Sequence, residues 1–190
     1  VRAHVAAKEV GLKLLIGAEI VPDDGPPVVL LATNRDSYGR LCRLLTVGRR
    51  RAPKGGCRVT QTDIAEHSQG LLACVVLATC VNSAASTDLR RYREMFDDRC
   101  YGLAAVHCGP NDRALLQKAK NVVQEYKVPL VASNDVHYHV SRRRFLHDVV
   151  TAIRHRSTVA ELVHRRFANG ERYLKPPQKI AELFADCPEA

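Results

Sequence analysis

The feature that most constrains this chain is a regular alternation of short apolar runs with amphipathic helical patterns. Five runs are continuously apolar without strict polar alternation, which is typical of strands buried on both faces of a parallel sheet. They cover residues 13–20, 28–32, 71–77, 101–106 and 128–132. The alternation predicts an α/β fold with a mostly parallel sheet, either open or closed into a barrel.

Helices are predicted between and after these runs. The clearest covers residues 112–127, where the apolar residues follow one helical face and Val128-Pro129 ends the helix. Another begins at Asp36 or Ser37, with Tyr38, Leu41, Leu44 and Leu45 on one face, and a last helix follows Pro176-Pro177. The helix after Ser141 is expected to turn five apolar residues inward: Phe145, Leu146, Val149, Val150 and Ile153.

Charge and cysteine content narrow the class of protein. The chain has 29 Lys and Arg against 20 Asp and Glu, a net charge of +9, which favours polyanionic partners such as nucleic acid or phosphorylated substrates. No apolar run approaches the roughly 20 residues of a membrane-spanning helix, and the N-terminal residues lack the layout of a signal peptide. Seven cysteines without a CxxC pair favour free thiols in a reducing cytoplasm. A zinc site at His107 and Cys108 is disfavoured because adjacent residues rarely bind one metal ion.

Polar residues at the ends of predicted strands are the candidate site residues, because function gathers at the C-terminal ends of strands in α/β folds. Asp135 and His137 follow one strand, and residues two apart on an extended chain point the same way, so they suit zinc or manganese. The alternative is a polar surface loop. Glu19 is either a ligand or a surface residue, and His107 is either a ligand or a buried histidine bonded to a carbonyl group.

Arginine clusters are the second candidate feature. Residues 49–56 are predicted as an irregular basic loop in which Arg49, Arg50, Arg51 and Lys54 contact the phosphates of DNA. Arg142–Arg144 and Arg165-Arg166 form further basic sets. The alternative is that these arginines are solvated, pair with carboxylates or dock against other domains. The remaining histidines in basic, helical surroundings are expected at the surface: His139, His147, His155 and His164.

Taken together, these segments resemble the N-terminal PHP (polymerase and histidinol phosphatase) domain of bacterial DNA polymerase III alpha subunits. The resemblance includes Gly17-Ala18-Glu19 and Asn134-Asp135-Val136-His137-Tyr138. It spans almost the whole chain, through residues 11–19, 29–38, 70–73, 128–138, 148–153 and 171–176. Residues 38–46 and 48–52 look most like the error-prone paralogue, and residues 183–190 look like the family's lead into its palm domain.

The resemblance implies a seven-stranded β/α barrel with a metal cluster at the strand ends, in which Glu19, Asp135 and His137 fall on ligand positions. Because the family's first ligands would lie before Val1, we expect an incomplete barrel lacking its N-terminal strands. We expect residues 1–165 to be a truncated PHP domain and residues 166–190 to begin the connection to a polymerase palm domain. The palm aspartates and their magnesium would lie outside this chain, so no catalytic residue is assigned within it.

The implied function is that of a fragment of an error-prone DNA-directed DNA polymerase, active in DNA replication and mutagenic repair synthesis. The domain is expected to bind divalent metal, with a possible vestigial phosphoesterase role, and to be inactive alone. Expected partners are DNA, the other polymerase domains, and a sliding clamp or mutagenesis accessory proteins. The alternatives are a stand-alone metal-dependent phosphoesterase and a non-catalytic basic scaffold that positions polymerase or DNA.

Overall fold

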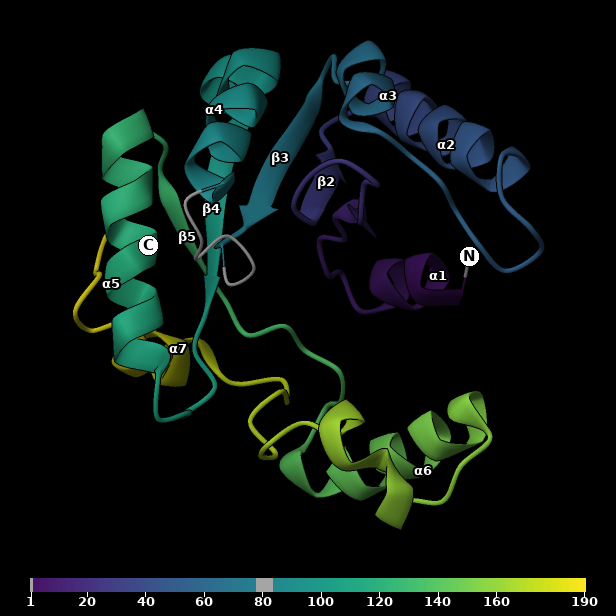
Figure 1. Ribbon diagram of the computed structural model, residues 1–190, viewed down its shortest axis with the longest axis vertical. Coiled ribbons are helices and arrows are strands. Elements are labelled where there is room, and N and C mark those ends of the chain that lie inside the picture. Colours follow the sequence, from purple (N-terminus) through teal and green to yellow (C-terminus); the bar gives the residue numbers. More distant parts are fainter. Residues whose placement is uncertain (1, 78–83) are drawn as a thin grey trace. The chain divides into compact units, whose positions relative to one another are not determined.

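The computed structural model describes residues 2–77 and 84–190, apart from the side chains of residues 84–87 and 164 (Figure 1). Its strands form one sheet in the order β1-β2-β3-β4-β5. They are β1 (Ile16–Ile20), β2 (Val28–Ala32), β3 (Leu71–Val76), β4 (Cys100–Ala105) and β5 (Leu130–Ser133). All five predicted apolar runs therefore contain a strand, each within a few residues of the predicted bounds.

The directions of the first strands differ from the prediction. β1 pairs with β2 in antiparallel fashion, and β2 pairs with β3 in the same way. The prediction of a mostly parallel sheet is therefore wrong for this part, and the sheet is mixed and open. For β1 and β2 the physical reason is the connection: only seven residues, 21–27, lie between the two strands, and a link that short cannot carry a parallel crossover. The seven-stranded barrel stays a prediction.

Seven α-helices occur in the described residues. They are α1 (Arg2–Glu9), α2 (Arg35–Arg50), α3 (Gln61–Glu66), α4 (Ala84–Phe96), α5 (Asp112–Tyr126), α6 (Arg144–His155) and α7 (Pro177–Leu183). The N-cap of α2 is Asn34, whose side chain accepts a hydrogen bond from the Ser37 backbone, rather than the predicted Asp36 or Ser37. Helices α3 and α4 were not predicted. The spacing of Leu89, Tyr92 and Phe96, all fully buried, was the available signal for α4.

By its internal packing the chain divides into two compact units. Unit 1 comprises residues 1–102 and 122–129, and unit 2 comprises residues 103–121 and 130–190. Within the described residues, no helix combines the length and the apolar character that crossing a membrane requires. The six cysteines in these residues are free thiols, and Cys80 lies outside them.

The core of unit 1 lies on one face of its antiparallel strands. The pairing places Ile20, Val28 and Val75 in one row and Leu30 with Ala73 in another, and all five are buried. Helix α2 adds Leu41 and Leu44 and helix α4 adds Tyr92, whose hydroxyl donates to the Pro26 carbonyl at 3.2 Å. Tyr38, which was predicted on the same helix face as Leu41 and Leu44, is exposed. On the opposite face the row holds the buried Cys74 of β3, the half-buried Val29 of β2 and the exposed Glu19 of β1, so burial of this face decreases towards β1.

Helix α6 of unit 2 is turned opposite to the prediction. Its buried residues are Asp148 and Ala152, whereas Phe145, Leu146, Val150 and Ile153 are exposed. The buried face is held through polar groups, because Arg144 donates from Nη2 to the Phe167 carbonyl at 2.7 Å. The expected inward apolar stripe is therefore wrong, and the helix presents that stripe to solvent.

Candidate functional site

The candidate site of unit 2 is built where β4 and β5 end. His107 follows β4, and its Nε2 lies 3.2 Å from the carbonyl oxygen of Asn134, which follows β5. The backbone N–H of His107 donates to Asp112 Oδ2 at 2.7 Å. Burial first, and then the nearby Arg172 charge, hold the pKa of His107 below its ordinary value of 6.5. This is the arrangement of a histidine bonded to a carbonyl group, the commoner of the two alternatives considered for this residue.

Asn134 is the structural centre of this region, and the sequence argument did not single it out. Its amide group donates to the carbonyl oxygens of Glu171 and Tyr173, and its Oδ1 accepts from Lys175 Nζ at 3.0 Å. The Lys175 side chain is fully buried and pairs with Glu171 Oε2 at 3.2 Å. These hydrogen bonds hold residues 171–175 against the end of β5. A buried asparagine beside a strand end, paired with a lysine in a later segment, leaves no periodic signal in the sequence.

Asp135 and His137 converge as predicted. Asp135 Oδ1 lies 3.3 Å from His137 Nε2, although Asp135 has a φ of 42°, so the chain is not extended there as the prediction assumed. The other carboxylate oxygen of Asp135 pairs with Arg172 Nη1. Arg172 itself stacks over the Phe167 ring, 4.3 Å from its centroid. A guanidinium therefore occupies one side of the carboxylate, a partner that the sequence argument did not identify.

Two histidines and an aromatic ring surround the same point. The His137 ring lies edge-on to Phe167, and the His147 ring stacks on Phe167 with centroids 4.8 Å apart. His147 was expected at the surface, but it is half-buried, so that prediction is wrong. The reason is that α6 turns its polar side inward. Beside these rings lies a cavity of about 420 Å³, lined by His137, Tyr138, His139, Arg143, Leu146, His147 and Val150.

A metal ion would find few ligands here. In the part of the chain that the structure describes, no three His, Cys, Asp or Glu side chains come close enough to hold one. Asp135 and His137 supply two donors, and Arg172 competes for the carboxylate. His107 directs Nε2 to a carbonyl oxygen. As arranged, these residues of unit 2 fit a divalent cation poorly.

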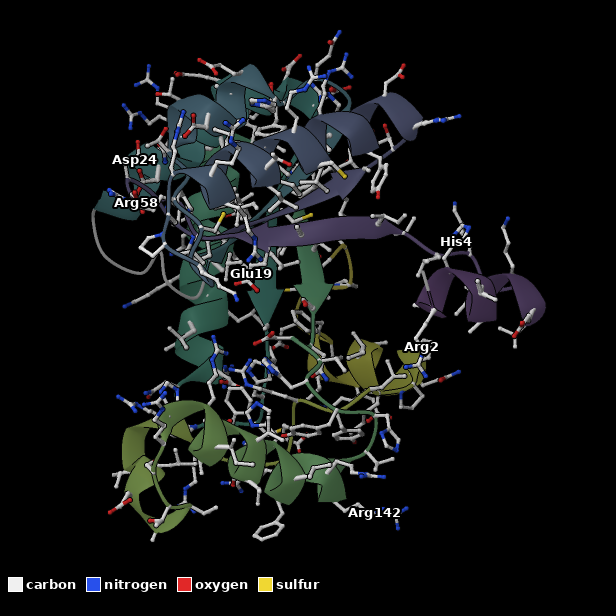
Figure 2. The ribbon with its side chains drawn as sticks, turned by 90° about the vertical axis from the view of Figure 1, so that its right-hand side faces the viewer. Arg2, His4, Glu19, Asp24, Arg58 and Arg142 are labelled. Carbon is white, nitrogen blue, oxygen red and sulfur yellow. The ribbon has the colours of Figure 1, made fainter. Side chains whose placement is uncertain are left out.

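Glu19 belongs to unit 1. It lies one residue before the end of β1, opposite Val29 in the pairing, and it is exposed (Figure 2). β1 is the edge strand of the sheet order. Both readings of Glu19, as a ligand or a surface residue, stay open.

The predicted basic loop is partly helical. Arg49 and Arg50 form the last turn of α2, and Arg51 is its C-cap. Arg51 Nη1 donates to Asp63 Oδ2 at 2.6 Å, so this arginine has a carboxylate partner, as the alternative reading held. Arg49, Arg50 and Lys54 are exposed. The prediction of an irregular loop from residue 49 is therefore wrong for Arg49 and Arg50, which are helical.

Comparison with known proteins finds relatives that are similar along almost the whole chain. No protein-family profile matches it. It is 41% identical, over its full length, to error-prone DNA polymerase 1 of Agrobacterium fabrum, of which it covers 17%. It is 40% identical to the error-prone DNA polymerase of Rhodopirellula baltica, of which it covers 18%, and 44% identical over 98% of its length to that of Pseudomonas syringae pv. syringae, again covering 18%. The chain thus spans less than a fifth of the length of these relatives, and it is related to one region of these error-prone DNA polymerases.

Proposed function

We propose that this chain is the PHP-domain region of an error-prone DNA-directed DNA polymerase that acts in DNA replication and mutagenic repair synthesis. The observation that carries the proposal is the similarity to error-prone DNA polymerases along the whole chain, at 41% identity for the Agrobacterium protein. The five strands at the expected positions and the convergence of Asp135 with His137 support it. The aspartates that bind magnesium and add nucleotides would belong to another region, and DNA would be the partner.

Within that polymerase we assign the region a scaffolding role. The Asp135 carboxylate is already held by Arg172, so zinc or manganese binding there requires this ion pair to open. Metal binding at Asp135 and His137, with His107 as a further ligand, is the second candidate function and would allow phosphoester hydrolysis by a metal-activated water. A stand-alone phosphoesterase acting on small phosphate monoesters is its variant. The cytoplasmic location and the accessory partners stay predictions.

The polymerase assignment is tested by primer extension. The complete gene product that contains this sequence is purified and supplied with a primed DNA template, all four deoxynucleotides and Mg²⁺. We expect template-dependent extension by the complete product and none by the 190-residue chain. A complete product that binds DNA and still extends no primer would contradict the proposal.

The scaffolding role is tested by metal content and cleavage. We expect the purified chain to retain less than one equivalent of zinc or manganese after dialysis, and to leave single-stranded DNA intact in the presence of Mn²⁺. His137→Ala is the informative variant, and His139→Ala is the matched control because His139 is an exposed neighbour. Stoichiometric metal or Mn²⁺-dependent cleavage that His137→Ala abolishes and His139→Ala retains would establish the metal-dependent alternative instead.

A further inference from the structure

Helix α6 carries an apolar face that nothing in the described residues covers. The exposed fractions are 69% for Phe145, 47% for Leu146, 56% for Val150 and 71% for Ile153. These residues recur at helical spacing along α6, whereas Asp148 and Ala152 of the same helix are buried. A contiguous stripe of large apolar side chains at the surface is costly in water and is typical of an interaction site.

The stripe continues into the cavity of about 420 Å³. Leu146 and Val150 belong to both. The other lining residues carry hydrogen-bond donors: the rings of His137, His139 and His147, the Tyr138 hydroxyl and the Arg143 guanidinium. Asp135 already pairs with Arg172, and Asp148 is buried with Arg144 Nε at 4.0 Å and His147 Nδ1 at 3.9 Å, although its Oδ1 has no hydrogen-bond partner among the described residues. The cavity is therefore apolar on one side and suited to a carboxylate on the other.

The segment that contains the stripe is strongly basic. Residues 139–170 contain seven arginines against two carboxylates, Asp148 and Glu161. The arginines are Arg142, Arg143, Arg144, Arg154, Arg156, Arg165 and Arg166. All except Arg144 are exposed, and Arg142 projects away from the ribbon in Figure 2. An apolar stripe with a cationic rim is complementary to a surface with an apolar stripe and an acidic rim.

We propose that the α6 face and its cavity dock an acidic amphipathic helix of a partner protein. Its apolar side would cover Phe145, Val150 and Ile153, and one of its Glu or Asp side chains would enter the cavity beside Arg143. This is the helix-in-groove mode of recognition, in which a few apolar anchors provide most of the binding energy. DNA offers no apolar stripe to pair with Phe145 and Ile153, and a flat bilayer surface does not fill a side-chain-sized cavity.

The proposal concerns residues of unit 2 alone and does not depend on the polymerase assignment. Its test is binding of the full chain to a fluorescein-labelled peptide of about 18 residues, long enough to form a helix in water. The peptide has Leu at i, i+3, i+4 and i+7 and Glu on the flanking positions; a second peptide has Lys in place of each Glu. Fluorescence anisotropy is expected to show saturable binding of the Glu peptide, weakened by added salt, and at least tenfold weaker binding of the Lys peptide.

Matched variants separate the two parts of the surface. Phe145→Ala with Ile153→Ala is expected to weaken binding of the Glu peptide by about tenfold or more, whereas Val10→Ala with Leu12→Ala, also exposed apolar residues, leaves it unchanged. Arg142→Ala with Arg154→Ala should weaken binding and reduce its salt dependence, whereas Arg49→Ala with Arg50→Ala should not. Circular dichroism confirms that each variant is folded, which is expected because all these side chains are exposed.

Three results would overturn the proposal. The first is equal affinity of the α6 apolar variant and the parent chain for the Glu peptide. The second is no peptide binding together with binding of an oligonucleotide or of phosphatidylglycerol vesicles that Arg142→Ala with Arg154→Ala removes, which would assign the face to a polyanion or lipid surface. The third is self-association in sedimentation velocity that Phe145→Ala with Ile153→Ala abolishes, which would make the occupant a second copy.

Discussion

Asp63 links the end of α2 to the start of α3. It accepts hydrogen bonds from Arg51 at 2.6 Å and from the backbone and hydroxyl of Thr60, both at 2.9 Å. Thr60 and Asp63 form the capping box at the start of α3. Asp63→Ala removes the carboxylate half of this box and leaves Arg51 without its partner, so we expect the free energy of unfolding to fall by about 1–3 kcal/mol. Urea unfolding of unit 1 measures the change. Glu66→Ala in the same helix is the control, since Glu66 is exposed, and an equal loss in the two variants would contradict the role of the cap.

The same carboxylate predicts a pH dependence. Burial alone raises the pKa of Asp63, but the hydrogen bonds from Thr60 and Arg51 outweigh it and hold this pKa below the ordinary 3.8. Because the folded pKa lies below the unfolded one, the stabilisation is complete well above pH 4 and is lost as the pH falls below that value. We therefore expect the parent chain and Asp63→Ala to differ in stability at pH 6 and to converge towards pH 3. A difference that stays constant over this range would show that ionisation of Asp63 contributes nothing.

Asn134 gives the corresponding prediction for unit 2. Asn134→Ala removes an acceptor of the buried Lys175 ammonium and the donor to the Tyr173 carbonyl group, whereas the Glu171 carbonyl group keeps Lys175 Nζ as a donor. Unsatisfied buried groups cost about 1–3 kcal/mol each, so we expect a loss of at least about 2 kcal/mol in the free energy of unfolding. Thermal unfolding measures the loss against Asn121→Ala, whose amide is exposed on α5. Similar midpoints for the two variants would mean that water replaces the Asn134 contacts.

At the scale of the element, α2 contains two glycines with opposite surroundings. A Cβ at Gly48 would lie 2.5 Å from Val59 Cγ2 and 2.7 Å from Cys57 Sγ, whereas a Cβ at Gly39 would meet nothing within 4 Å. Alanine is the better helix former by about 1 kcal/mol, and overpacking costs about 1–3 kcal/mol. We expect Gly39→Ala to raise the melting temperature and Gly48→Ala to lower it. Two shifts of the same sign would contradict the close packing of α2 on the segment around Val59.

The apolar pattern located both α5 and α6, but it identified the buried side correctly only for α5. The bounds of α5 match the prediction to one residue. In α6 the helix was predicted correctly, but its buried side was not, because the periodicity of Phe145, Val149 and Ile153 locates a stripe without saying what covers it. The polar side is buried instead, through Asp148 and the Arg144 contact to the Phe167 carbonyl.

At the scale of the whole molecule, the net charge of +9 predicts DNA binding that weakens steeply with salt, because each neutralised phosphate releases counterions. Arg49, Arg50 and Lys54 are the candidates, and Arg51 is excluded from the test set because it holds Asp63. Replacing the three by Ala should weaken duplex binding for all sequences and reduce the log–log salt slope by up to about 0.9 per lost contact.

The control for this prediction is a set of other exposed basic residues of unit 1: Arg90→Ala with Arg43→Ala and Lys13→Ala. This set removes the same three charges from other positions. Titration of labelled duplex at several salt concentrations separates specific phosphate contact from net charge. Equal slopes for the two triple variants would mean that residues 49–54 hold no privileged contact with DNA.

The sequence by itself determined the strands, most helices, the convergence of Asp135 with His137 and the relation to a polymerase region, because each of these is written in local patterns or in order along the chain. Only the tertiary structure decided the antiparallel directions of β1 to β3 and the position of Asn134. It also decided that Arg172 pairs with Asp135, that Asp63 pairs with Arg51, and that the apolar stripe of α6 is exposed. These depend on groups from segments far apart in the chain, such as Asp135 with Arg172 or Asn134 with Lys175. Packing determines which buried polar groups bond to each other, because an unpaired buried group is costly. Such pairs have no periodic pattern in the sequence.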